Sequence, residues 1–190
     1  MNVNMFEGKK VRLRGVVPDD WRHFLAWDTD SDAQRYGWQV WPPQGEEAAK
    51  EFAKEESLKK PTDPNFRLII ETLSDVAVGS LNVRGDTRRF SFEYGISIGR
   101  DHWGYGYAEE AVELVCRYMF GELRFHKIQG WVYGFNQRSQ SMHRKFGMTL
   151  EGTIREGQFT DGRFWDVLVF GMTDGEFFER YGERWGDLGD

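Results

Sequence analysis

The clearest hydrophobic pattern in the chain lies between Phe90 and Ile98, where apolar residues alternate with Ser, Glu or Gly. A period of two sends neighbouring side chains to opposite faces of a strand, so this segment is predicted to be a β-strand. Gly95 inside it indicates a bulge or a close backbone approach. Weaker patterns predict further strands at residues 9–17, 66–72, 76–83, 127–133, 148–154 and 164–172.

Other segments have the spacing of three and four residues that is typical of amphipathic helices. The strongest runs from Ala108 to Phe120 and is followed by Gly121, a residue type that often ends a helix. Further helices are predicted at residues 46–58, after Pro18, after the capping residue Asn136, and at residues 176–185. The segment from Asp30 to Pro43 is predicted to be a loop, because its two closing prolines stop regular structure.

Strands and helices therefore alternate along the chain without a repeat or a linker between them. This order predicts an α/β protein with one mixed sheet and helices on its faces. A length of 190 residues suits a single domain that spans residues 1–190.

Charge and cysteine content narrow the functional class. The formal net charge of −6 argues against a general nucleic-acid binder and mildly favours a cationic partner such as an amine. Cys116 is the one cysteine, which excludes an intramolecular disulfide and fits the cytosol. Because neither a signal peptide nor an apolar run of about 20 residues is found, a cytoplasmic protein without a membrane span is expected.

A glycine-rich turn, Gly104-Tyr105-Gly106, leads directly into the strongest helix. A helix N-terminus offers free N–H donors and a positive dipole end, and glycines let an anion come close to the backbone. The pattern therefore predicts a phosphate or pyrophosphate site. It is neither a dinucleotide fingerprint nor a P-loop, because the third glycine and the Gly-Lys-Ser/Thr sequence are missing. A plain structural turn explains the two glycines equally well.

Two motifs, in the same order and at a similar separation, resemble those of GNAT acetyltransferases. The segment from Trp103 to Ala111 is similar to the family's coenzyme A motif, Gln/Arg-x-x-Gly-x-Gly/Ala, with Trp103 in the Gln/Arg place. The segment from Asn136 to Met148 is similar to the family's Asn-x-x-Ser stretch that ends in Leu-Gly-Phe. The resemblance covers nearly the whole chain. It is greatest to the branch that acetylates ribosomal-protein N-termini and to the related spermidine acetyltransferases.

The resemblance implies the GNAT fold, a central and mostly antiparallel sheet flanked by helices, and acetyl-CoA as co-substrate. It also implies which residues bind acetyl-CoA through backbone or side-chain groups: Ile96, Ile98, Trp103, Gly104, Tyr105, Gly106, Tyr107, Ala108, Asn136, Ser139 and Lys145. Asn136 is equally suited to capping a helix, and Lys145 and Arg100 are equally suited to being surface charges.

Amine acetylation needs a base and benefits from an acid. An alkyl amine, with a pKa near 10.4, must lose a proton before it attacks, and the leaving thiolate gains one. Glu93, in the place where the family often has a carboxylate, is the candidate base; the alternative is a solvent-facing glutamate. His143, in the place of the family's usual Tyr, is the candidate acid, and it shares a helix face with Ser139. The alternative is a histidine that only packs.

The acceptor is less defined. Trp38 and Trp41 lie in the early segment that covers the acceptor in this family, so both are candidates for substrate binding. A protein N-terminus, a polyamine or another small amine would each suit an acidic, aromatic pocket.

Cys116 is interpreted as a buried small side chain, and scattered histidines predict no metal site. A homodimer is a family expectation, and a non-catalytic acetyl-CoA sensor is the alternative function.

Overall fold

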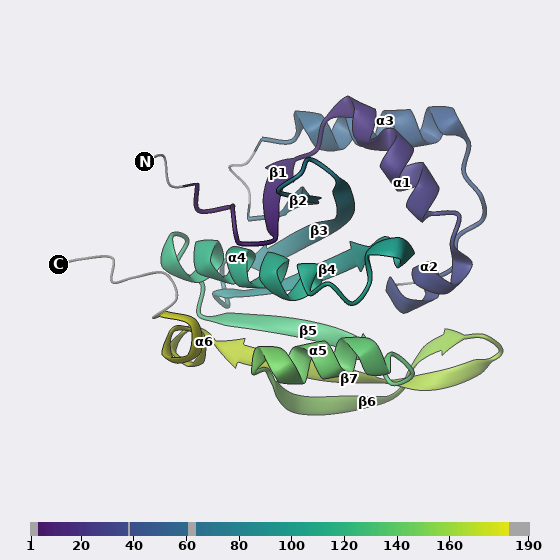
Figure 1. Cartoon of the computed structure of the whole chain (residues 1–190). Helices are drawn as coiled ribbons and strands as arrows, with labels where there is room; N and C mark the ends of the chain where they lie inside the picture. The colour runs from purple at the N-terminus through teal and green to yellow at the C-terminus, as the bar shows by residue number, and fades with distance from the viewer. Residues whose placement is uncertain (1–3, 38, 61–63, 183–190) are drawn as a thin grey trace. The chain divides into compact units, whose positions relative to one another are not determined.

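The computed structural model describes residues 4–37, 39–60 and 64–182 (Figure 1). The strands are β1 (Val11–Gly15), β2 (Phe66–Thr72), β3 (Ala77–Asp86), β4 (Ser91–Ile98), β5 (Lys127–Tyr133), β6 (Thr149–Thr160) and β7 (Arg163–Thr173). The α-helices are α1 (Trp21–Trp27), α2 (Ser31–Gly37), α3 (Glu46–Leu58), α4 (Tyr107–Gly121), α5 (Gln137–Phe146) and α6 (Asp174–Tyr181). Short 3-10 turns stand before α1 (η1, Pro18–Asp20) and after β4 (η2, Arg100–His102).

Within the described part of the chain, hydrogen bonds order seven strands as β1-β2-β3-β4-β5-β7-β6. The pair of β4 and β5 is parallel, whereas β1 with β2, β2 with β3, β5 with β7, and β6 with β7 are antiparallel. The predicted class, a mixed sheet flanked by helices, is confirmed. A turn at Asp161-Gly162 joins β6 to β7, and both of its residues have a positive φ.

The chain divides into two compact units. Unit 1 comprises Met1–Arg84 and Gly95–Val115, and unit 2 comprises Gly85–Tyr94 and Cys116–Asp190. The divisions fall within β3, β4 and α4, so each of these elements contributes residues to both units. The units are described separately below.

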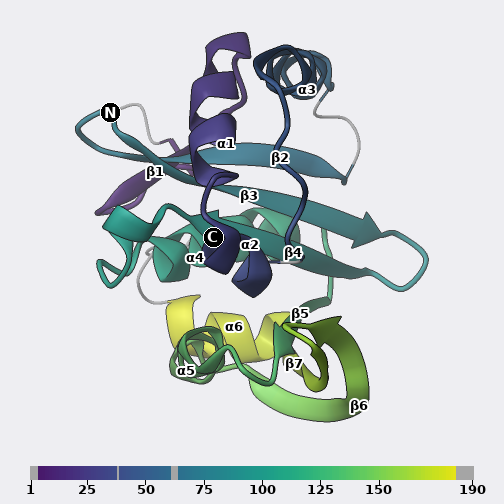
Figure 2. The ribbon, with the colours of Figure 1, turned by 90° about the vertical axis from the view of Figure 1, so that its right-hand side faces the viewer.

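In unit 1, α1 and α3 lie side by side and share a small apolar core with β2 (Figure 2). Phe24 of α1 packs edge-on against Phe52 of α3, with ring centroids 5.1 Å apart. Ile69 of β2 and Ala53 of α3 are fully buried beside them. Helical spacing on α1 and α3 thus produces the apolar faces that the sequence predicts.

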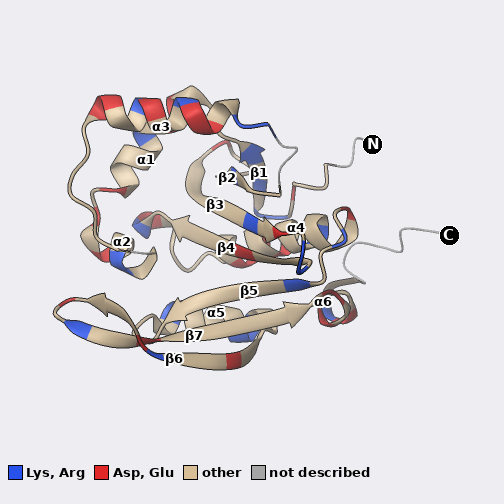
Figure 3. Ribbon diagram, turned by 180° about the vertical axis from the view of Figure 1, so that it is seen from behind, with Lys and Arg blue, Asp and Glu red and all other residues tan. Residues whose placement is uncertain are grey.

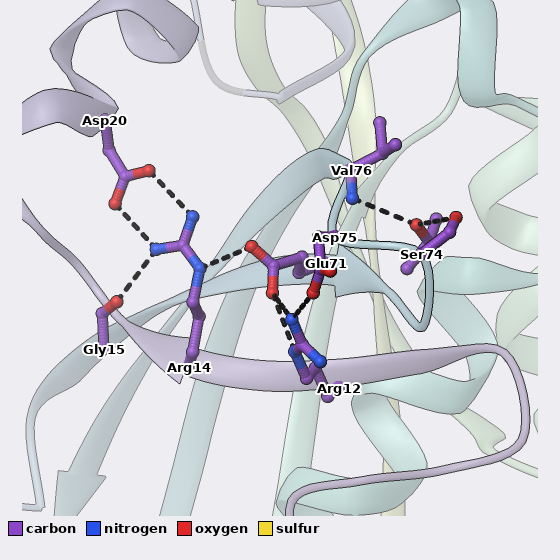
Figure 4. A network of polar contacts seen from close by, with 9 residues as sticks. Arg12, Arg14, Gly15, Asp20, Glu71, Ser74, Asp75 and Val76 are labelled. Carbon is purple, nitrogen blue, oxygen red and sulfur yellow. Dashed lines mark hydrogen bonds and ion pairs between the residues drawn. The ribbon is translucent and has the colours of Figure 1, made fainter.

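The two arginines of β1 hold this strand to its surroundings (Figure 4). Arg14 donates to both oxygens of the buried Asp20 at 2.9 Å, and its Nε donates to Glu71 of β2 at 2.7 Å. Arg12 binds the other oxygen of Glu71 and also reaches Asp75. Because a carboxylate buried without a partner is costly, this network lets Asp20 and Glu71 stay charged.

Unit 2 has an aromatic core. Phe92 of β4 packs against Phe120 of α4 at 5.4 Å, and Phe177 of α6 lies between Phe120 and Phe146 of α5. Helix α5 lies on one face of β5 and β7, in front of them in Figure 1. Seen from behind in Figure 3, the other face of β5, β7 and β6 carries none of the described helices of this unit.

The prediction of a loop from Asp30 to Pro43 is wrong for its first half, because residues 31–37 form α2. Asp30 accepts the N–H of Ala33 at 3.0 Å, which caps this helix. The helix buries none of its residues, so it has no apolar stripe that a periodicity search could detect. The predicted loop is confirmed at residues 39–43.

Candidate functional site

The glycine-rich turn has the backbone conformation that the sequence predicts. Gly104 and Gly106 have φ values of +88° and +80°, a region that side chains other than glycine rarely adopt. Helix α4 begins at the next residue, Tyr107. The turn therefore presents exposed backbone at the positive end of a fifteen-residue helix, where an anion is favoured.

The N-terminal segment of the chain supports this turn. The Lys10 ammonium donates to the Tyr105 carbonyl at 2.9 Å, and a Cβ placed on Gly106 would lie 2.8 Å from the Lys10 nitrogen. The carboxylate of Glu110, in the first turn of α4, accepts the N–H groups of Lys9, Lys10 and Val11 at 2.7 to 3.0 Å. Lys10 thus adds a positive charge beside the predicted anion site, which the sequence alone did not reveal.

Trp103 does not extend freely into solvent. Its indole N–H donates to the Ile98 carbonyl at 2.7 Å, which closes the turn between β4 and the glycines. The Ile98 carbonyl is therefore engaged, and Ile96 lies two residues earlier on the same strand. Arg100 is not placed as a free phosphate contact either, because both oxygens of Asp30 bind its guanidinium.

Unit 2 carries the second group of predicted residues, on α5. The Asn136 side chain accepts the N–H of Ser139 at 3.0 Å, so the predicted helix cap is confirmed. Ser139 is half-buried one turn before His143, as predicted from their spacing. Lys145 is exposed near the opposite end of the helix, about 13 Å from Asn136 at 1.5 Å per residue. The structure thus brings Asn136, Ser139 and His143 to one stretch of α5 and leaves Lys145 apart from Asn136.

His143 is buried, with 3% of its surface exposed, and both ring nitrogens have partners. Its Nδ1 lies 2.7 Å from the Ser139 carbonyl, which can only accept, so Nδ1 carries the proton. Burial lowers the pKa of His143, although the bond to Ser139 opposes this shift. The ring is therefore neutral near pH 7, and Nε2 accepts the hydroxyl hydrogen of Tyr94 at 2.8 Å.

Tyr94 is one of the residues of unit 2 that sequence reasoning missed. Its ring stacks on His143 with centroids 5.9 Å apart, and burial raises the pKa of its hydroxyl. Gly130 of β5 makes room for the pair, since a Cβ there would lie 2.4 Å from His143 Nε2. The pair joins residues 49 positions apart, so no local pattern marks it.

Glu93 is exposed on the face of β4 opposite to the buried Phe92. It stands in register with Gln129 of β5, so both side chains share one face of the sheet. Trp131, two residues further along β5, lies on that face with 47% of its surface exposed. Trp131 was also missed, although the alternation of residues 127–133 could have indicated it. This face of unit 2 therefore offers a carboxylate and an open aromatic ring.

The other predicted residues are placed as follows. Trp41 is exposed and donates its backbone N–H to the Gln34 side chain at 2.9 Å. Trp38 lies outside the described residues. Cys116 is fully buried, as predicted. Among the described residues, no group of three or more His, Cys, Asp or Glu side chains could hold a metal ion, and no helix is long and apolar enough to cross a membrane.

Comparison with known proteins identifies the family. The model of the acetyltransferase (GNAT) domain matches residues 10–149. The chain is 30% identical over 184 residues to the SPbeta prophage-derived uncharacterized N-acetyltransferase YokL of Bacillus subtilis, covering 96% of this chain and all of that one. It is 25% identical over 160 residues to the spermidine N(1)-acetyltransferase of Escherichia coli, covering 83% of each.

Solved structures agree on the fold. The Vibrio cholerae spermidine N-acetyltransferase in complex with CoA and spermine has a TM-score of 0.78 at 20% identity, over 90% of this chain and 99% of that one. A GNAT-family acetyltransferase from Bacillus anthracis has a TM-score of 0.77 at 21% identity, with the same coverage of each chain. The chain belongs to the GNAT family, and it is an acetyltransferase.

Proposed function

We propose that this acetyltransferase takes its acetyl group from acetyl-CoA and transfers it to an aliphatic amine, with polyamines as the substrate class. The observation that carries the proposal is the glycine turn at the start of α4. Gly104 and Gly106 are held at positive φ beside the Lys10 ammonium, and this exposed backbone suits the pyrophosphate of a coenzyme A thioester.

Further contacts to acetyl-CoA are assigned by resemblance. In unit 1 these are the backbone of Ile96, Ile98 and residues 103–108. In unit 2 they are Asn136 and Ser139, with Lys145 as a contact to a phosphate. Asn136 caps α5 through its side-chain oxygen, and the resemblance assigns it to the co-substrate as well.

A polyamine is favoured as the acceptor for three reasons. Relatives of this chain include enzymes named for spermidine. The net charge of −6 favours a cationic substrate. Glu93 and the exposed ring of Trp131 share a sheet face, and an alkyl ammonium binds both a carboxylate and an indole face. Trp41, on the exposed segment after α2, is proposed as a further acceptor contact.

In the proposed reaction, Glu93 accepts a proton from the ammonium, directly or through water. The amine nitrogen then forms a bond to the acetyl carbon as the carbon–sulfur bond breaks. The nitrogen loses its second proton, which leaves the neutral amide, and the thiolate takes up a proton. His143 remains our candidate for the acid that supplies this proton to the thiolate. Because its only proton is bonded to Ser139 and its Nε2 accepts from Tyr94, we propose that it acts together with Tyr94.

The test is thiol release from acetyl-CoA with spermidine, spermine, peptides that begin with Ala or Ser, and aminoglycosides. We expect turnover with the polyamines. Glu93→Gln should lower kcat/KM about 100-fold, as loss of a general base does, with unchanged acetyl-CoA affinity. Glu122→Gln, an exposed carboxylate in the loop after α4, is the matched control and should leave activity unchanged.

Each outcome has a distinct meaning. Turnover only with peptides would reject the polyamine class and keep the acetyltransferase. Turnover that survives in Glu93→Gln would remove Glu93 from the mechanism. A protein that fails to bind acetyl-CoA would overturn the proposed function.

We also propose that the protein works in the cytoplasm, where acetyl-CoA is available, and that it forms a homodimer. The strand order supports the dimer, because β6 is an outer strand with one open edge. At the end of the β6–β7 hairpin, the exposed rings of Phe159 and Phe164 pack against each other at 5.0 Å. Such a surface suits burial against a second copy.

A further inference from the structure

Helix α2 is tied to the turn that precedes the glycines, and both belong to unit 1. Arg100 in that turn uses Nε and Nη2 to bind the two carboxylate oxygens of Asp30, the second at 2.7 Å. The guanidinium also lies 3.7 Å from the carboxylate of Asp32, in the first turn of α2. The Arg100 hydrogen bonds lower the pKa of Asp30 to about 2, so this ion pair persists at neutral pH.

The indole of Trp103 completes the connection. The Arg100 guanidinium stacks over its ring at 5.0 Å, and Tyr36 near the end of α2 meets the ring edge-on at 6.2 Å. The same indole is fixed by its hydrogen bond to the Ile98 carbonyl. Both ends of α2 therefore contact this turn. Arg100 binds Asp30 and Asp32 at the start of the helix, and Trp103 packs against Tyr36 near its end. Trp103 directly precedes Gly104.

Helix α2 depends on such contacts for its order. Its seven residues are far fewer than an isolated helix needs in water, and none of them is buried. An element with little buried apolar surface opens at low free-energy cost, and any change at its attachment alters that cost. The conformation of the turn before the glycines and the order of α2 are thus linked through Arg100.

We propose that Arg100 is a positioning residue that couples acetyl-CoA binding at the glycine turn to the order of α2. The inference rests on the proposed function, which places acetyl-CoA at this turn and the acceptor near the segment after α2. When acetyl-CoA fixes the conformation of the turn, it also restricts the positions of Trp103 and Arg100. Their contacts with Tyr36 and Asp30 then restrict the two ends of α2. Because coupling is reciprocal, an ordered α2 would in turn strengthen the binding of acetyl-CoA.

Amide hydrogen exchange, followed by mass spectrometry on peptides from residues 28–37, tests the coupling without any acceptor. Coenzyme A at saturation should slow exchange in these peptides of the wild type by roughly 5-fold or more, the lower end of typical coupling. In Arg100→Met the slowing should disappear, while peptides covering residues 104–112 are still protected. Asp30→Asn is a second variant, because Asn preserves the helix cap and loses the charge.

Arg22→Met is the matched control. Arg22 also binds an aspartate, Asp19 at 3.0 Å, and also stacks over an indole, Trp21 at 4.7 Å, but both partners lie within three residues of it in the sequence. This variant should show the wild-type response to coenzyme A. An equal loss of response in Arg22→Met would reduce the Arg100 effect to a general loss of charge and overturn the proposal.

Two other results would also overturn the inference. Slowing of residues 28–37 that persists in Arg100→Met and in Asp30→Asn would show that coupling does not pass through this ion pair. Protection of residues 104–112 without any change in α2 of the wild type would show that there is no coupling, and would leave the proposed function intact. If coenzyme A protected neither region, the proposed function would fall together with the inference.

Discussion

The glycine turn before α4 consists of predicted residues, whereas the Tyr94–His143 pair joins one predicted residue, His143, to one that was missed. The two regions are held in place by opposite means. The turn is exposed, and charged side chains support it from outside, with Lys10 on Tyr105 and Arg100 on Asp30. The pair is enclosed, and neutral hydrogen bonds and ring stacking hold it. The family resemblance thus covers two regions that should respond differently to salt and to pH.

Salt and pH should separate the two regions. Contacts between exposed charges are screened by ions, so salt should weaken the support of the glycine turn. The buried pair carries no charge near neutral pH and should respond little to salt. It should instead respond to any condition that forces a proton onto His143.

The largest expected effect comes from filling the space beside His143. In Gly130→Ala, a Cβ 2.4 Å from Nε2 must push the ring away and break its bond to Tyr94. We expect a loss of about 3 kcal/mol in the free energy of unfolding, at the upper end for overpacking. Urea unfolding of the whole protein, followed by its tryptophan fluorescence, would measure it.

A double variant provides the control. Removing the ring in His143→Ala relieves the clash, so Gly130→Ala should cost much less in that background. If Gly130→Ala were as stable as the wild type, Gly130 and His143 would not be in contact as described.

A smaller effect is expected at the glycine turn. Alanine in place of Gly106 must adopt a φ of +80°, which costs about 1–2 kcal/mol, and its Cβ meets the Lys10 ammonium. In the free protein the strained turn should relax to another conformation, and acetyl-CoA must restore it on binding. The Kd for acetyl-CoA, measured by calorimetry, should therefore rise about tenfold, because 1.4 kcal/mol corresponds to that factor. Gly121→Ala, at a position with open space and no positive φ, should leave the Kd unchanged. An equal rise in both variants would contradict the role of the turn.

The smallest effect is the pH response of the buried pair. The pKa of His143 is lower in the folded protein than its ordinary value near 6.5, so the unfolded chain binds the extra proton first. Its contribution to the free energy of unfolding is therefore fully present above about pH 6.5 and decreases as the pH falls through the folded pKa.

Denaturant unfolding of the wild type and of His143→Gln at pH 7.5 and pH 5.5 would measure this response. The wild type should lose stability between the two values, and the variant should lose less. Equal losses would show that His143 titrates normally. Both measurements at high salt should give the same difference, whereas the support of the glycine turn should weaken.

The features that were predicted well from the sequence are those that depend on the spacing of residues within one segment. The alternation from Phe90 to Ile98 predicted β4, and the three-and-four spacing after Tyr107 predicted α4, whose residues from Ala111 to Cys116 are buried. Helix α2 was missed because polar contacts from Arg100 and Trp103 stabilise it, and no apolar face marks it.

The predicted site shows the same division. The glycine turn was found because its two glycines stand directly before a strongly patterned helix, and Asn136 was found because capping is local. The partner of His143 could not be found in this way. Tyr94, His143 and Gly130 come from β4, α5 and β5, and only the folded sheet brings them together.

The bond between Glu110 and the backbone of residues 9–11 has a practical consequence for experiments on this protein. The same short segment carries Lys10, which binds the Tyr105 carbonyl. A fusion partner or affinity tag attached ahead of this segment would therefore disturb the turn through the Lys10 contact and the Glu110 contacts. Coenzyme affinities measured on amino-terminally tagged material should therefore be compared with those of the cleaved protein before any variant is interpreted.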